Sequence, residues 1–168
     1  MSGRQAKVLL DQQIENLLVY TSTTRHPDRN RVIVLLSVKA GLRASEIANV
    51  TWDMVVDPTG AVGSMLELRD HAAKNKSGRT IPLHPDLRAA LVAWRDRTGA
   101  VVGPIIESER RMRMTAMSIV NWFAAAFRTA GLEGCSSHSG RRTFITTAAR
   151  VVHQAGGSLR DVHLLAGH

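Results

Sequence analysis

Apolar residues recur at helical spacing along most of the chain, and this pattern predicts a mainly helical protein. The clearest stripes run through residues 11–18, 32–38, 85–97, 119–127, 139–155 and 159–165. Residues 32–38 are apolar on nearly every side, so we expect their helix to lie at the centre of the fold. The stripe in residues 139–155 is also expected to face a core.

Between the second and third stripes the period changes from helix to strand. Leu66 and Leu68 alternate with other residues, and residues 79–83 form a second short extended segment. A basic loop that contains Lys74 and Lys76 joins them, so we predict an antiparallel hairpin with a lysine-bearing tip. The expected fold class is α+β, mainly α, with a small antiparallel sheet. No repeat or internal linker interrupts residues 1–168, which we interpret as a single domain.

The charge balance points to a partner. The sequence has 22 Lys and Arg against 14 Asp and Glu, a formal net charge of +8. This excess favours a polyanion, with nucleic acid ahead of a membrane surface. Aromatic residues make up only 4%, too few for the stacking platforms that bind single strands or RNA. Duplex DNA, contacted through its backbone, is therefore the expected partner.

Cysteine content and apolar run length bear on the compartment. Cys135 is the only cysteine, which rules out a disulfide framework or a Cys-based zinc site within one chain and favours a reducing compartment. The longest apolar runs, such as residues 32–36, are too short to span a bilayer, and the N-terminus lacks a signal pattern. We therefore expect a cytoplasmic, nucleoid-associated protein with no membrane partner.

A histidine and two arginines open the stripe at residues 139–155. His138 and Arg141 are three apart and should share one face of the first helical turn. Unpaired N–H groups and the positive end of the helix dipole favour an anion there, and an arginine fork fits a phosphate. We expect Arg141 to face this anion and not the core, so that its loss weakens binding with little effect on the fold. Three serines could cap this helix: Ser136, Ser137 and Ser139.

Three further basic residues lie next to predicted loops or helix ends: Arg43, Lys74 and His168. Each also has a purely structural explanation. Arg43 could simply pair with Glu46 three residues later, Lys74 could be a solvated loop charge, and His168 could be a helix-end histidine favoured by the dipole. The His138–Arg141 pair could likewise be a basic, solvated helix start. Taken singly, each structural explanation is at least as good as a catalytic one.

Taken together, these positions form an ordered set. Residues 41–47, a hairpin lysine ahead of residues 79–83, the His138–x–x–Arg141 spacing and residues 164–168 follow one another along the chain. The set resembles the catalytic domain of the tyrosine recombinases, also called phage-type integrases, from about residue 11 to residue 168. The resemblance implies a mostly helical domain with a small antiparallel sheet that grips duplex DNA, and site-specific recombination or integration as the activity.

The resemblance also assigns roles to the two arginines. Arg43 and Arg141 would bind the non-bridging oxygens of the scissile phosphate, with Glu46 supporting Arg43. Phosphodiester transfer builds negative charge on oxygen, and fixed guanidinium donors stabilise that charge as it grows. Arginines can stand in for a metal here, and the sequence has no carboxylate cluster of the two-metal type, so we expect neither a metal nor another cofactor.

The remaining implied roles concern protons. Lys74, eight residues before Pro82, would be the general acid for the departing 5′ oxygen, in preference to Lys76. His138 and His168 would hydrogen-bond the phosphate or move protons. All five catalytic residues should converge on one concave basic face. Further DNA contacts are expected from three basic residues next to these positions: Lys76, Arg79 and Arg142.

The family's nucleophile and N-terminal domain are the departures from the pattern. In the family the nucleophile is a tyrosine a short distance beyond the position of His168, whereas the single tyrosine here, Tyr20, lies in the first predicted helix. We therefore expect these 168 residues to lack the nucleophile and the N-terminal core-binding domain, and to be inactive alone. Transfer through a phosphotyrosyl intermediate and self-association on DNA are expected of the complete system.

Other functional classes remain open. The main alternative is a non-catalytic duplex-DNA-binding regulator or remnant with the recombinase fold. A helix-turn-helix protein would need a recognition helix where Pro58 and Gly60 interrupt the chain. No phosphate-binding or dinucleotide glycine motif occurs, so a nucleotide cofactor is not expected. Three histidines lack the spacing of a metal site on one helix face: His153, His163 and His168.

Overall fold

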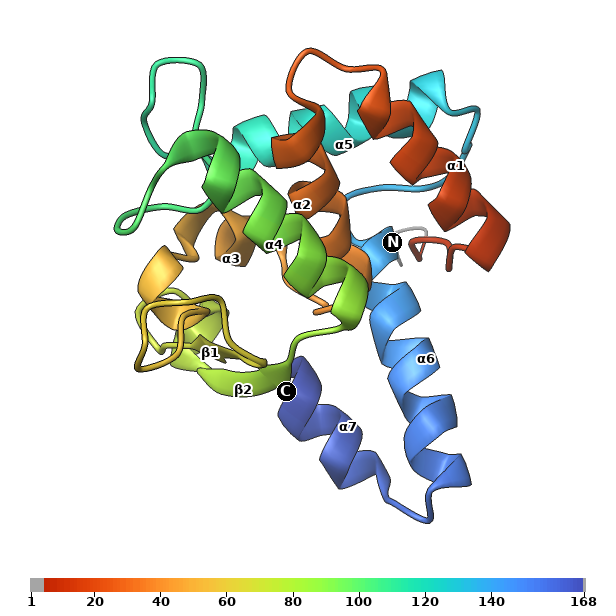
Figure 1. The fold of residues 1–168 in the computed structure, drawn as a ribbon. Coiled ribbons are helices and arrows are strands. Elements are labelled where there is room, and N and C mark those ends of the chain that lie inside the picture. Colours follow the sequence, from red (N-terminus) through yellow and green to blue (C-terminus); the bar gives the residue numbers. More distant parts are fainter. Residues whose placement is uncertain (1–4, 168) are drawn as a thin grey trace.

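A computed structural model describes residues 5–167 of the chain. Within that range the α-helices are α1 (Asp11–Ser22), α2 (Pro27–Val38), α3 (Ala44–Asn49), α4 (Pro85–Thr98), α5 (Ala116–Thr129), α6 (Ser139–Gln154) and α7 (Leu159–Ala166). The strands are β1 (Met65–Leu68) and β2 (Arg79–Pro82), and two 3-10 turns are formed by Trp52–Met54 and Lys74–Lys76. Figure 1 shows helices making up most of the fold, with the two strands at one side. The predicted class, α+β and mainly α, is confirmed.

Helix α2 lies at the centre, as its all-round apolar sequence predicts. It packs against α1, α3, α4 and α6. Its side chains from Val32 to Leu36 have no exposed surface. Proline opens the helix at Pro27, where a missing N–H costs nothing. Gly41, with φ +68°, turns the chain after its end, directly into the segment that contains Arg43.

The two strands form the antiparallel hairpin that the alternating pattern predicts. Leu66 pairs with Ile81 and Leu68 with Arg79. Leu66, Leu68 and Ile81 are buried, so one face of the hairpin packs on the core. The connecting loop contains the short turn Lys74–Lys76, in which Asn75 has positive φ.

Helix α6 is only partly buried. Near its start a Cβ on Gly140 would overlap the side chain of Ser37, so α6 approaches α2 very closely there. Farther along, Val151 is 57% exposed and Ala155 is exposed. The expectation that the whole stripe faces the core is therefore wrong for this half, because α6 extends past α2 and away from the body of the domain (Figure 1). Helix α7 then returns, and its end lies beside β2.

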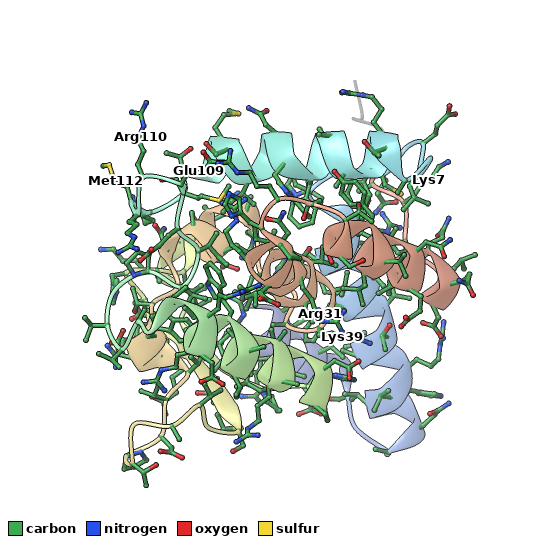
Figure 2. All side chains as sticks on the ribbon, turned by 45° about the horizontal axis from the view of Figure 1, so that its top comes forward. Lys7, Arg31, Lys39, Glu109, Arg110 and Met112 are labelled. Atoms are coloured by element: carbon green, nitrogen blue, oxygen red, sulfur yellow. The ribbon has the colours of Figure 1, made fainter. Side chains whose placement is uncertain are left out.

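The loop between α4 and α5 extends outward from the body. Figure 2 shows Arg110 and Met112 pointing away from the molecule on this loop. Met112 is 65% exposed, and Arg110, Arg111 and Arg113 are exposed too. None of the helices between residues 5 and 167 is long and apolar enough to cross a membrane.

Candidate active site

A buried carboxylate lies at the centre of the candidate site. Glu46, in the first turn of α3, has no exposed surface and accepts five hydrogen bonds. Oε1 accepts from Nη1 of Arg43 at 3.0 Å, Nη1 of Arg79 at 3.1 Å and the backbone N–H of Lys74 at 3.3 Å. Oε2 accepts from the backbone N–H of Arg43 at 2.9 Å and Nη2 of Arg79 at 3.0 Å.

These partners decide the charge of Glu46. Burial alone would raise its pKa, but the hydrogen bonds and charge of Arg79, with the backbone N–H groups of Arg43 and Lys74, outweigh burial and lower the pKa to about 2. Glu46 is therefore a carboxylate at every physiological pH. It joins the start of α3 to the hairpin loop and β2, about 30 residues later in the sequence.

Arg43 immediately precedes α3 and reaches Glu46 through one terminal nitrogen. Its side chain is 21% exposed. The Arg43–Glu46 pair that we considered as a structural explanation is thus present, yet it leaves part of the Arg43 side chain exposed. The preceding turn is tightly constrained, because a Cβ on Gly41 would overlap the ring of Phe144 in α6. Helix α6 therefore fixes the backbone from which Arg43 projects.

Arg141 is buried in the first turn of α6, which contradicts the expectation of a solvent-facing arginine. Its Nη1 donates to the carbonyl of Gly41 at 2.8 Å and its Nη2 to the carbonyl of Ala166 at 2.7 Å. Burial lowers the pKa of Arg141 to about 10, and the positive charges of Arg43 and Arg79 act in the same direction. Arg43 and Arg79 both bond Glu46, and Arg79 and Arg141 bond the adjacent carbonyls of Leu165 and Ala166, so the three guanidiniums are neighbours. With one carboxylate among them the cluster has a net positive charge.

His138 and Arg142 flank Arg141 on the outer side. His138 is exposed and occupies the N-cap position of α6, so none of the three serines is the N-cap residue. A side-chain cap is absent there, although Ser139 Oγ accepts from the backbone N–H of Ser136 at 3.0 Å. His138, Arg141 and Arg142 line a shallow hollow of about 450 Å³ beside the N-terminal segment. A histidine and two arginines thus border one concave surface.

The hairpin residues differ in exposure. Lys74 and Lys76 are exposed, and the backbone N–H of Lys74 is the group that contacts the cluster. The side chain of Arg79 is only 4% exposed, so it offers almost no surface for a direct DNA contact. Its inward direction could have been read from the sequence, because Arg79 and Ile81 are two residues apart on a strand and share the buried face.

His168 lies outside the described residues, which end one position earlier, at Gly167. The single tyrosine, Tyr20, is half-buried against the core on α1, a helix that packs on α2 and α5. Within residues 5–167, no three His, Cys, Asp or Glu side chains come together as metal ligands. The structure thus brings together Arg43, Glu46, Arg141 and the backbone of Lys74, with His138 alongside.

Comparison with known proteins gives a family and a fold. A model of the phage integrase family matches residues 7–168. XerA recombinase superposes with a TM-score of 0.78 at 22% identity, covering 100% of this chain and 56% of that one. Residues 75–356 of lambda integrase bound to DNA give 0.76 at 19%, covering 100% and 57%. The integrase from mycobacterium phage Brujita gives 0.71 at 22%, covering 100% and 51%.

These solved structures are longer than the present chain, which spans between about half and three-fifths of their length. At these identities the likeness concerns the fold. Among curated proteins, none matches the sequence.

Proposed function

The chain belongs to the phage integrase family, and from that premise we propose that this domain binds duplex DNA and stabilises phosphodiester strand transfer in site-specific recombination or integration. The observation that supports this most is the placement of Arg43 and Arg141. They come from different elements, lie close enough for their charges to interact, and are held by groups that fix their orientation. Lambda integrase, which shares the fold, has been solved bound to DNA, which supports a duplex partner.

The proposed chemistry uses fixed positive charge. As the nucleophile attacks phosphorus, negative charge builds on the non-bridging oxygens, which accept from Arg43 and from the N–H groups of Arg141 that its bonds to Gly41 and Ala166 leave unused. Because the guanidiniums are already oriented, little reorganisation is needed when the charge appears. Glu46 holds Arg43 in place. His138, exposed beside Arg141, donates to the same phosphate or moves a proton.

The proposed intermediate is a phosphotyrosine. The tyrosine oxygen forms a bond to phosphorus, the bond from phosphorus to the 5′ oxygen breaks, and Lys74 protonates that oxygen. In the second half a 5′ hydroxyl of the partner strand attacks the phosphotyrosine and releases the tyrosine. Tyr20 lies on α1 and packs against the core, so we assign the nucleophile to a tyrosine outside these 168 residues. We expect protomers to associate on DNA during the exchange.

A covalent trapping experiment tests this function. Duplexes selected for binding from a randomised pool are nicked near the bound region, so that cleavage releases a short fragment and leaves the covalent adduct in place. A longer natural version of the protein with a downstream tyrosine should form an adduct that survives denaturing electrophoresis, whereas residues 1–168 should bind and form none. An adduct with residues 1–168 that persists after Tyr20→Phe would refute the assignment of the nucleophile. Binding without an adduct from any longer version would favour a regulator or remnant.

A further inference from the structure

We propose that Arg79 is a positioning residue of the site: it neutralises Glu46 and holds the last turn of α7, and thereby keeps the charge of Arg43 available to an anion. The inference rests on the proposed function only for the identity of that anion, a DNA phosphate. Arg79 begins β2, directly after the loop that contains Lys74. It connects the hairpin to two other parts of the site.

The first contact is with Glu46. Both terminal nitrogens of Arg79 bond the carboxylate, at 3.1 and 3.0 Å, whereas Arg43 uses one terminal nitrogen. The side chains of Arg79 and Glu46 are 4% and 0% exposed, so little water screens the pair. Two-point binding of this kind is the strongest geometry for an arginine and a carboxylate. Glu46 is therefore mainly the partner of Arg79.

This pairing matters for Arg43. With Arg79 present, the carboxylate is shared between two guanidiniums, and Arg43 keeps most of its positive potential. Without Arg79, Glu46 would have Arg43 as its only side-chain partner, and that pair would be neutral as a whole. Arg43 would then be drawn toward the carboxylate and away from an incoming phosphate.

The second contact is with the end of α7. Nε of Arg79 donates to the carbonyl of Leu165 at 2.9 Å, and Arg141 takes the next carbonyl, that of Ala166. The last carbonyls of a helix lack partners within the helix, so the two arginines cap it. Gly167 packs directly on this cap, because a Cβ there would lie 2.7 Å from Nη1 of Arg79. Its φ of +73° also favours glycine.

Three variants separate charge from geometry in the full 168-residue chain. Arg79→Met removes the positive charge and the hydrogen bonds of the guanidinium. Arg79→Lys keeps the charge but cannot reach Glu46 and Leu165 together. The double variant Arg79→Met/Glu46→Gln removes the opposing charges as a pair. The matched controls are Arg97→Met and Arg97→Met/Asp28→Asn. In that ion pair Arg97 is exposed and Asp28 is half-buried, and it lies at the other end of α2, about 18 Å from the site by helix length.

The first readout is duplex DNA binding at several salt concentrations. If Arg43 loses its phosphate in Arg79→Met, the slope of log affinity against log salt should shrink by about 0.9, the contribution of one contact. The slope should stay near wild type in Arg79→Lys and return toward wild type in the double variant, while both controls leave it unchanged. A double variant with the reduced slope of Arg79→Met would overturn the neutralising role and favour a direct phosphate contact by Arg79.

The second readout needs no DNA. Amide hydrogen exchange of Gly167, whose N–H donates to the carbonyl of His163, reports on the last turn of α7. All three Arg79 variants should speed this exchange by about 10- to 100-fold, as expected for the loss of a hydrogen bond from a charged donor, with no change in α5 or in the controls. If Arg79→Met does not fold, Arg79→Lys gives the same comparison. Unchanged exchange would overturn the role of Arg79 at α7.

The two readouts also separate this inference from the proposed function. A wild-type chain whose binding ignores salt would refute the DNA function and, with it, the role of Arg79 in keeping Arg43 available to a DNA phosphate. Exchange at Gly167 would still decide whether Arg79 holds α7.

Discussion

Acid should destabilise this domain through Glu46 in a defined pH window. The pKa of Glu46 is about 2 in the folded protein against an ordinary value of 4.5. Each pKa unit corresponds to about 1.4 kcal/mol, so the ionised, hydrogen-bonded carboxylate contributes on the order of 3 kcal/mol to the free energy of unfolding at neutral pH. Because folding lowers this pKa, the contribution is fully present above pH 4.5 and is lost as the pH falls from about 4.5 to about 2.

The measurement compares wild type with Glu46→Gln by urea unfolding between pH 7 and pH 2. At pH 7 the variant should be less stable by roughly 3 to 5 kcal/mol, because a neutral amide leaves buried guanidiniums without a counter-charge. The difference between the two proteins should shrink as the pH falls through the window, since the wild-type carboxyl becomes neutral too. The free energy of unfolding of the variant is subtracted from that of wild type at each pH, because other carboxyl groups with lowered pKa, such as Asp53, also titrate at acid pH.

Asp53→Asn is the matched control. Asp53 pairs with Arg69 at the surface, where both side chains are about half exposed, so this substitution should change the free energy of unfolding by less than about 1 kcal/mol. A stability difference between wild type and Glu46→Gln that stays constant from pH 5 to pH 2 would refute the reasoning. Glu46 would then not be the strongly stabilised carboxylate that its five hydrogen bonds indicate.

Three further predictions concern packing and catalysis. Arg141→Ala should lower the free energy of unfolding by about 2 to 4 kcal/mol in urea, since two buried carbonyls lose their donors. Gly140→Ala should cost about 1 to 3 kcal/mol by overlap with Ser37, whereas Ser37→Ala should be neutral or stabilising, because its buried hydroxyl has no hydrogen-bond partner among the described residues; thermal unfolding checks both. Lys74→Ala should leave stability within about 0.5 kcal/mol, yet slow strand cleavage in a version that includes the nucleophile. A substrate with sulfur in place of the leaving 5′ oxygen, which needs no proton to depart, should restore that cleavage rate.

Local sequence patterns were enough to predict the helices and the hairpin, because they depend on periods within one segment. Residues 32–36 are all apolar, so this part of α2 has no polar face, and their side chains are fully buried. The alternation around Leu66 likewise places it opposite Ile81. The same reasoning failed for Val151, since a helical stripe shows which residues could be buried but not whether another element covers them. Only the length of α6 relative to its neighbours decides that.

The environment of each charged residue was harder to predict, because it depends on contacts between distant segments. Arg141 was expected at the surface, yet its donors reach Gly41 and Ala166, positions 100 and 25 residues away. No local pattern contains that information. Arg79 is different: its spacing from Ile81 placed it on the buried face, and the charge of the side chain obscured that signal.

The cluster around Glu46 conflicts with what stability alone would favour. Three guanidiniums surround one carboxylate, and the lowered pKa of Arg141 reflects burial together with repulsion from Arg43 and Arg79. A domain shaped only for stability would replace such a group with apolar side chains, which often stabilise a fold better than buried charges do. The uncompensated positive charge becomes favourable when an anion with several acceptor oxygens enters, and the gain is largest when that anion acquires further charge in a transition state. Arg141, which caps α7 and holds the turn at Gly41, would then supply part of that charge, so the fold and the proposed chemistry depend on the same contacts.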